Sequence, residues 1–392
     1  MGPTSRRNNK HNRDLLVKSG DLLSCDLNFA ANLSMPFPCM ALPFQSLQAK
    51  KRSQVVAIDL GSRITKAVHV QRKGTGFELL SYALRETPPP DKGSLSSKLP
   101  EHLKRVSEDL GAKTKQVAIA VGVGDSLLRH GELPMIPVSD MRQMLKFNSK
   151  NYLQQDLPDH VFDCYILQAA APAGGEPAKG TQKCRVLIGA AKKQFISDLQ
   201  AAAKGAGLVV DIIMPGLAGP PNAFELAQPE AFAREIVALV DIGAKNTTIS
   251  VLAGGELMLS RVVGVGGEKL TGGLAESLGI SNAEAEGMKL GMPEDVQMVM
   301  TTLLIPLGRE LRASVDFFEH QHDKAVSQVF VSGGSARSEF IVKTLKEELM
   351  LETKTWNPVG FMQLSLPPQQ IGEVEQVAPQ LAVATGVAVS AL

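Results

Sequence analysis

Two segments of the chain carry the same arrangement of residues that can contact a phosphate group. Residues 55–68 read VVAIDLGSRITKAV and residues 237–250 read VALVDIGAKNTTIS. The shared residues, 182 positions apart, are Asp59, Gly61 and Thr65 in the first copy and Asp241, Gly243 and Thr247 in the second. Glycine lets the backbone approach a phosphate, amides and hydroxyls donate to its oxygens, and the aspartate can hold Mg²⁺ directly or through water. The repeat therefore favours phosphate binding over two structural hairpins, which is the ordinary explanation of a single Asp-x-Gly turn.

A third glycine-rich element follows the second copy. Residues 328–347 combine an apolar strand at 329–331, the pair Gly333-Gly334 and a predicted amphipathic helix. A strand, a glycine turn and a helix in this order can let a nucleotide lie against the backbone near a helix N-terminus. Taken alone, the pair is equally typical of a structural turn, and its position after the repeat is what favours a ligand.

The elements around the two Asp-x-Gly turns also repeat. Each copy opens with an apolar, β-branched run typical of a buried strand, and a second strand follows the turn. Each then turns again, at residues 73–76 and 253–256, before apolar runs at 77–84 and 257–265. Two copies of one strand meander predict an α/β fold with two lobes.

The composition excludes several kinds of partner. The 392 residues are enough for at least two cores, and 41 Lys and Arg against 40 Asp and Glu give no net field that would attract nucleic acid or anionic lipid. No uncharged apolar run reaches the roughly 18 residues that a spanning helix needs. The cysteines match neither a metal knuckle nor a disulfide framework, which favours a cytoplasmic protein. They are Cys25, Cys39, Cys164 and Cys184.

Residues 1–52 differ from the rest of the chain. They carry eight Lys or Arg against three Asp and show no sustained period, which predicts a disordered basic arm. A signal peptide with residues 33–44 as its apolar core is the alternative, although Pro36, Pro38 and Pro43 interrupt this stretch. A start of translation at Met35 or Met40 would remove much of the arm.

The order of these motifs resembles the actin, heat-shock chaperone and sugar-kinase superfamily. In this resemblance Asp59–Lys66 and Asp241–Thr248 are the two phosphate motifs, and Val329–Ala336 is the adenosine motif. Within the superfamily the chain is most similar to the PilM family of type IV pilus assembly proteins, which is related to the cell-division protein FtsA. The similarity covers the chain from about residue 54 onward. Further matching segments are Leu127–Pro137, Ala285–Lys289 and Asn357-Pro358.

The resemblance implies an actin-like fold of the duplicated, ribonuclease H-like kind, with Mg²⁺ and ATP as cofactors. Ser62, Arg63, Thr65 and Lys66 are expected around the terminal phosphates, although Arg63 could instead face solvent. Asp59 and Asp241 are expected to hold Mg²⁺, and Glu286 and Lys289, three apart on one helix face, to meet the ribose unless they form only a solvated ion pair. The remaining expected nucleotide contacts are Gly61, Gly243, Ala244, Lys245, Thr247, Gly266, Gly267, Gly333, Gly334 and Ser335.

The resemblance also implies a binding partner, the cytoplasmic tail of an inner-membrane protein similar to PilN. Membrane contact is then indirect, self-association is possible and nucleic acid is not a ligand. The chain departs from the family at Phe147–Lys150, where it lacks two acidic residues. The segment 210–225, which joins the lobes, offers only Asn222 within its turn to orient a nucleophile, so ATP turnover is expected to be slow or absent. The alternatives are a small-molecule kinase and an FtsA-like cell-division protein.

The expected architecture has a first lobe at residues 53–235 and a second at 236–392, each with a mixed sheet of about five strands. A small subdomain is expected within the first lobe at about residues 115–192, with strands at 116–121, 160–171 and 184–191 and an exposed loop at 172–183. The apolar C-terminal tail is expected to form a helix that packs on the second lobe, unlike the membrane-bound basic helix of FtsA.

Overall fold

The computed structural model describes residues 53–91, 95–167 and 182–392. The predicted basic arm at 1–52, and with it the stretch that a signal peptide would use, lies outside the described residues. So does most of the predicted loop at 172–183. Among the helices of the described part, none combines the length and the apolar character that crossing a lipid bilayer requires.

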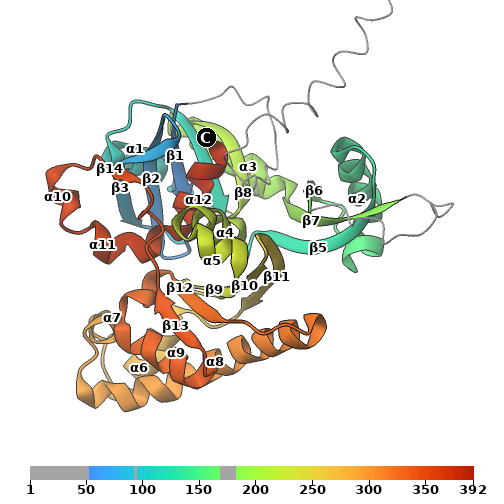
Figure 1. Cartoon of the computed structure of the whole chain (residues 1–392). Helices are drawn as coiled ribbons and strands as arrows, with labels where there is room; N and C mark the ends of the chain where they lie inside the picture. Colours follow the sequence, from blue (N-terminus) through green and yellow to red (C-terminus); the bar gives the residue numbers. More distant parts are fainter. Residues whose placement is uncertain (1–52, 92–94, 168–181) are drawn as a thin grey trace, which may run out of the picture. The chain divides into compact units, whose positions relative to one another are not determined.

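The first sheet has six strands in the order β14-β3-β2-β1-β4-β8 (Figure 1). Strands β1, β2 and β3 form an antiparallel meander, and β1, β4 and β8 run parallel, so the carboxyl ends of these three meet at one edge. The strands are β1 Gln54–Asp59, β2 Ile64–Lys73, β3 Gly76–Glu86, β4 Gln116–Val121, β8 Val209–Pro215 and β14 Gln363–Leu364.

Helices bury both faces of this sheet. The helices α1 (Leu99–Leu110) and α3 (Lys193–Gly205) pack on the face that carries Val56 and Ile58. The helices α4 (Gly219–Ala227) and α12 (Ala382–Ala391) contact each other, and α12 also contacts β1, β2 and β4. Short elements adjoin these helices in the chain. They are η1 Gly216–Ala218, α5 Pro229–Arg234, α10 Pro368–Ile371, α11 Val374–Val377 and η3 Ala378–Leu381, of which η1 and η3 are 3₁₀ turns.

The second sheet repeats the meander of the first. Its order is β11-β10-β9-β12-β13, with β9, β10 and β11 antiparallel and β9, β12 and β13 parallel. Its strands are β9 Ile236–Ile242, β10 Thr247–Ala253, β11 Glu256–Val263, β12 Gln328–Ser332 and β13 Glu352–Thr355. The helices α6 Gly267–Leu278, α7 Asn282–Gly291 and α8 Glu294–His322 connect β11 to β12. The 3₁₀ turn η2 Gly334–Arg337 and the helix α9 Glu339–Leu349 connect β12 to β13.

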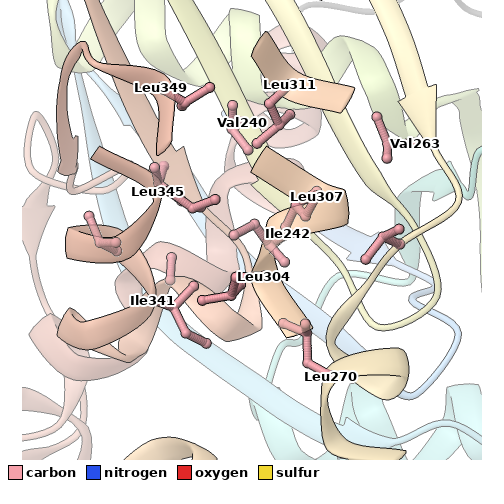
Figure 2. Packing of buried hydrophobic residues seen from close by; sticks show 14 of the residues in the cluster. Val240, Ile242, Val263, Leu270, Leu304, Leu307, Leu311, Ile341, Leu345 and Leu349 are labelled. Carbon is pink, nitrogen blue, oxygen red and sulfur yellow. The ribbon is translucent and has the colours of Figure 1, made fainter. Parts of the chain in front are cut away.

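A continuous apolar core joins this sheet to its helices. Figure 2 shows Val240 and Ile242 of β9 packed against Leu304, Leu307 and Leu311 of α8, with side chains of α9 beside them. Leucines at intervals of three and four residues place one face of α8 on the sheet, as an amphipathic helix requires. This core holds the carboxyl end of β9, and with it Asp241, in a fixed position.

A small third sheet has the order β5-β7-β6 and is antiparallel throughout. Its strands are β5 Ser126–Pro134, β6 His160–Ile166 and β7 Lys183–Lys192. The helix α2 (Val138–Leu153) covers it and buries Met141 and Leu145 against the strands. This unit corresponds to the small subdomain expected from the sequence, but its extent differs.

Strand β4 does not belong to the small subdomain. The sequence analysis places residues 116–121 there, whereas β4 pairs with β1 and β8 in the first sheet. Residues 117–121 are all buried. A continuous apolar run buried on both faces is typical of a central parallel strand, and this explains the correction.

The C-terminal tail does not pack on the second sheet as expected. It returns to the first sheet, where β14 extends the edge at β3 and α12 packs against β1, β2 and β4. A side-chain carbon added at Gly386 of α12 would lie 2.7 Å from the Cα of Gly219 in α4, so the two backbones approach as only glycines allow. The added strand β14 also explains why this sheet has six strands and not about five.

Candidate functional site

A cavity of about 550 Å³ lies where the carboxyl ends of the parallel strands of both large sheets meet. Open α/β sheets bind ligands at this position, because the loops after parallel strands converge there. Both Asp-x-Gly turns and the third glycine turn line the cavity. Of the residues expected from the sequence, those lining it are Asp59, Gly61, Ser62, Arg63, Lys66, Asp241, Gly243, Ala244, Lys245, Gly267, Glu286, Lys289, Gly333, Gly334 and Ser335.

Two carboxylates and one ammonium group form the charged centre of the cavity. Asp59 and Lys66 are direct partners across β1 and β2, and Lys66 Nζ donates to Asp59 Oδ2 at 2.9 Å. The corresponding pair in the second copy is Asp241 and Thr248, so a hydroxyl takes the place of the ammonium group. Asp241 accepts a hydrogen bond from Ser332 Oγ at 2.8 Å. One cation therefore serves two aspartates.

The charges of these groups depend on one another. Burial alone would lower the pKa of Lys66, but the charge and hydrogen bond of Asp59, together with the charge of Asp241, raise it overall. Burial raises the pKa of Asp241, with Lys66 and Ser332 opposing this shift and Asp59 adding to it. A further cation beside Asp241 would favour its ionised form.

The backbone of both turns is held close to neighbouring carbonyl groups. A side-chain carbon at Gly61 would overlap the carbonyl oxygen of Ile64, so only glycine fits there. In the second copy the N–H of Gly243 donates to the Asn246 carbonyl at 3.0 Å, and the N–H of Gly267 donates to the Gly243 carbonyl at 2.9 Å. The second bond and the one from the N–H of Glu268 to the Ala244 carbonyl at 2.8 Å hold the N-terminus of α6 against the second turn, where the positive end of the helix dipole can face an anion.

A polar cluster centred on Glu286 connects the first turn to α7. Its Oε2 accepts from Lys289 Nζ at 2.8 Å and from Thr271 Oγ1 at 2.5 Å, and it pairs with Arg63 Nη1 at 2.9 Å. Burial would raise the pKa of Glu286, but these donors lower it to about 2. The expected ribose pair is thus a partly buried ion pair, in which Lys289 is buried and Glu286 is half-buried, and the tip of the first turn reaches it through Arg63.

The third glycine turn has a backbone conformation that glycine adopts and that would strain any other residue. Gly333 has φ of 94° and ψ of 176°, and a side-chain carbon there would lie 2.7 Å from the N and C atoms of Ile242. The N–H of Gly333 donates to the Pro379 carbonyl at 2.7 Å. This turn therefore packs directly on the end of β9, one residue beyond Asp241.

Three of the expected residues do not line the cavity. Thr65 is fully buried and bonds to Thr87 and His102, and Thr247 is fully buried and donates to the Val265 carbonyl at 2.6 Å. A side-chain carbon at Gly266 would overlap the carbonyl oxygen of Ala244, so Gly266 lies behind the second turn. These residues support the turns from the side away from the cavity.

The structure adds residues that the sequence analysis missed. Asp125 follows β4 in a Gly-Val-Gly-Asp turn, and burial raises its pKa while Lys192 and Lys245 lower it. An apolar strand followed by glycines and an aspartate is the signal that could have found it, had β4 been assigned to the first sheet. The remaining polar or glycine residues of the lining are Asn246 and Thr248, which belong to the second phosphate motif, and Gly122, Gly124, Gly216, Glu268, Arg337 and Gln380, which were not expected.

Several solved structures are similar to this chain. The chain is similar to that of a PilM–PilN type IV pilus biogenesis complex with 21% sequence identity and a TM-score of 0.75, over 87% of this chain and 99% of that chain. It is also similar to the ethanolamine utilization protein EutJ from Carboxydothermus hydrogenoformans, with 16% identity and a TM-score of 0.49, over 87% and 91%. The likeness to MreB5 of Spiroplasma citri bound to ADP has 12% identity and a TM-score of 0.48, over 85% and 94%.

The first of these similarities, together with the repeated meander and its helices, confirms the predicted actin-like α/β fold. The model of one protein family, the type IV pilus assembly protein PilM, matches residues 57–392. This match covers nearly all of the described chain and both copies of the repeat. The chain therefore belongs to the PilM family of type IV pilus assembly proteins.

Proposed function

We propose that this protein binds ATP with Mg²⁺ in the cavity and acts as an adaptor of the type IV pilus, or of a related secretion machine, at the inner membrane. The observation that carries the proposal is the convergence of both Asp-x-Gly turns and the Gly333 turn on one cavity. A cavity of about 550 Å³ is within the range of pockets that take ligands of nucleotide size.

The phosphates fit the part of the cavity where the two turns face each other. Lys66 supplies positive charge, backbone amides of the turns supply donors, and the N-terminus of α6 adds the positive end of its dipole. Mg²⁺ usually keeps several waters and takes only one or two carboxylates beside the phosphates. Asp59 and Asp241 match this donor set, and Mg²⁺ bound there would neutralise phosphate charge.

The nucleoside fits the side formed by α7 and the third glycine turn. Glu286 is held ionised and offers an acceptor for ribose hydroxyls, and Lys289 keeps its carboxylate in place. Gly333 and Gly334 leave the backbone open beside it. In this arrangement Arg63, now paired with Glu286, can turn toward a phosphate when ATP is bound.

Slow turnover of ATP fits the side chains of one segment beside the cavity. The segment that joins the two large sheets contributes Gly216 and Leu217 to the lining, and Asn222 is buried in α4. Neither lining residue has a side chain that could orient an attacking water. We expect phosphate release slower than about one per second, which is near the low end of enzyme rates.

The proposed partner is the cytoplasmic tail of an inner-membrane protein similar to PilN. Support comes from membership of the PilM family and from the fold shared with the protein of the PilM–PilN complex. The protein would then lie in the cytoplasm and reach the membrane through this partner. The burial of Val387, Ala388 and Val389 in α12 argues against an FtsA-like tail that lies on the membrane.

A calorimetric titration of Mg-ATP into the purified protein and into Asp241→Ala tests the nucleotide site. We expect saturable binding that the variant loses, with little phosphate released from the same samples. Absence of binding to the unmodified protein would refute the nucleotide proposal. Rapid phosphate release, or phosphorylation of a small metabolite, would favour an enzyme such as a kinase.

A synthetic peptide of the PilN-like tail, titrated with and without Mg-ATP, tests the adaptor proposal. We expect binding in at least one nucleotide state. Absence of binding in both states would contradict the adaptor function while leaving the nucleotide site untouched.

A further inference from the structure

A chain of buried and partly buried hydrogen bonds runs from α1 to the first Asp-x-Gly turn. His102 Nε2 lies 2.8 Å from Thr65 Oγ1, and Thr65 Oγ1 lies 2.8 Å from Thr87 Oγ1. Thr87 Oγ1 donates to the carbonyl oxygen of Gly61 at 2.8 Å. Thr65 is fully buried and His102 is buried, and neither residue lines the cavity.

The direction of every bond in this chain follows from the number of protons available. A hydroxyl group has one proton, and the Gly61 carbonyl can only accept, so the proton of Thr87 is used there. Thr65 must then donate to Thr87, and His102 must donate to Thr65 through a protonated Nε2. Burial lowers the pKa of His102, with Arg85 adding to this and Asp109 opposing it, and the direction of the bond to Thr65 places a proton on Nε2.

The end of the chain fixes the first turn at two points. The backbone N–H of Thr87 donates to the Arg63 carbonyl at 2.8 Å, in addition to the bond from its hydroxyl to Gly61. In a trans peptide the C=O of Gly61 and the N–H of Ser62 point in opposite directions. A Gly61 carbonyl held by Thr87 therefore turns the Ser62 amide away from Thr87.

We propose that His102, Thr65 and Thr87 are positioning residues that hold the first turn with the Ser62 amide directed into the cavity. This inference rests on the proposed nucleotide function, because the amide matters only if the cavity receives a phosphate. It assigns Thr65 a role one layer behind the phosphates, where the sequence analysis expected a direct contact.

The second copy of the repeat uses the corresponding threonine in the same manner. Thr247 is buried and donates to the carbonyl of Val265, directly before the glycines that begin α6. In both copies the threonine at this position donates to the segment that follows the third strand of the meander, to Thr87 in the first copy and to Val265 in the second. In the first copy Thr87 then extends the chain of hydrogen bonds to the turn.

The first experiment uses Thr65→Val, which removes the hydroxyl at nearly constant volume, and Thr65→Ser, which restores it. Ser81→Ala is the matched control. Ser81 lies in β3 of the same sheet, and its Oγ donates to the carbonyl of Leu110 in α1 at 2.7 Å without contacting the turn. We expect Thr65→Val to weaken Mg-ATP binding about tenfold or more, and Thr65→Ser and Ser81→Ala to bind nearly as the unmodified protein does.

Two further measurements keep the positioning role separate from the nucleotide proposal. Hydrogen exchange followed by mass spectrometry should show faster exchange at residues 59–64 in Thr65→Val without ATP, and unchanged exchange at residues 241–246. Nitrogen NMR of labelled histidine should show His102 protonated on Nε2 in the unmodified protein.

If ATP does not bind the unmodified protein but the exchange difference is present, the nucleotide proposal fails and the chain still positions the turn. Unchanged exchange at the first turn, or a His102 ring protonated on Nδ1 alone, would overturn the positioning role. Equal ATP affinity of Thr65→Val and the unmodified protein would also overturn it.

Discussion

Replacing Gly333 with alanine tests whether the third glycine turn is held in a conformation that only glycine adopts. With φ of 94° and ψ of 176°, Gly333 lies in a backbone region that costs other residues about 1–3 kcal/mol. The added carbon would also lie 2.7 Å from backbone atoms of Ile242, which cannot move without displacing β9. Overpacking of this kind costs about 1–3 kcal/mol more. We therefore expect Gly333→Ala to destabilise the protein by about 2–6 kcal/mol.

The neighbouring Gly334 provides the control. A side-chain carbon there would have its nearest neighbour, the Oε1 atom of Gln380, at 3.9 Å, so Gly334→Ala should change stability by less than about 0.5 kcal/mol. Thermal unfolding followed by circular dichroism measures both variants, and about 2 °C per kcal/mol is expected for a chain of this size. Equal melting temperatures for the two variants would refute the claim that the conformation of Gly333 requires glycine.

Two ion pairs give predictions in which the loss of stability of a variant grows as the pH rises. The pKa of Glu286 lies at about 2, below its usual 4.5, so its pairing stabilises the fold above pH 4.5 and is lost as the pH falls toward 2. We expect Glu286→Gln to cost about 2 kcal/mol at pH 7 after allowance for solvent screening, and denaturation in urea should show this difference narrowing below pH 4.5. Asp163 is buried against Arg142 Nη2 at 2.7 Å, and Arg142→Met should destabilise the small subdomain by about 3 kcal/mol at pH 7. Burial raises the pKa of Asp163 and Arg142 opposes this shift, so the deficit of Arg142→Met should grow as the pH rises above 3.8, and limited proteolysis beside the exposed Lys150→Met control measures it. A deficit that is independent of pH would contradict either account.

The local sequence determined the parts of the site that depend on short-range chemistry. Asp59 and Lys66 flank a short turn between two strands, so strand pairing alone brings them opposite each other. The glycines of the Asp-x-Gly turns are required by close backbone contacts within their own turns, Gly61 with Ile64 and Gly243 with Asn246. The repeat of a strand meander also predicted two large sheets of the same plan, and both are present.

Only the tertiary structure decided which element packs on which sheet. An apolar helix such as α12 is stabilised by burial against any apolar face, because the hydrophobic effect has no direction, and its place on the first sheet depends on the close contact of Gly386 with Gly219. The pairing of Arg63 with Glu286 and the role of Thr65 behind the turn likewise join residues distant in the chain. Such contacts depend on the relative positions of whole elements, and a local pattern of residues does not contain this information.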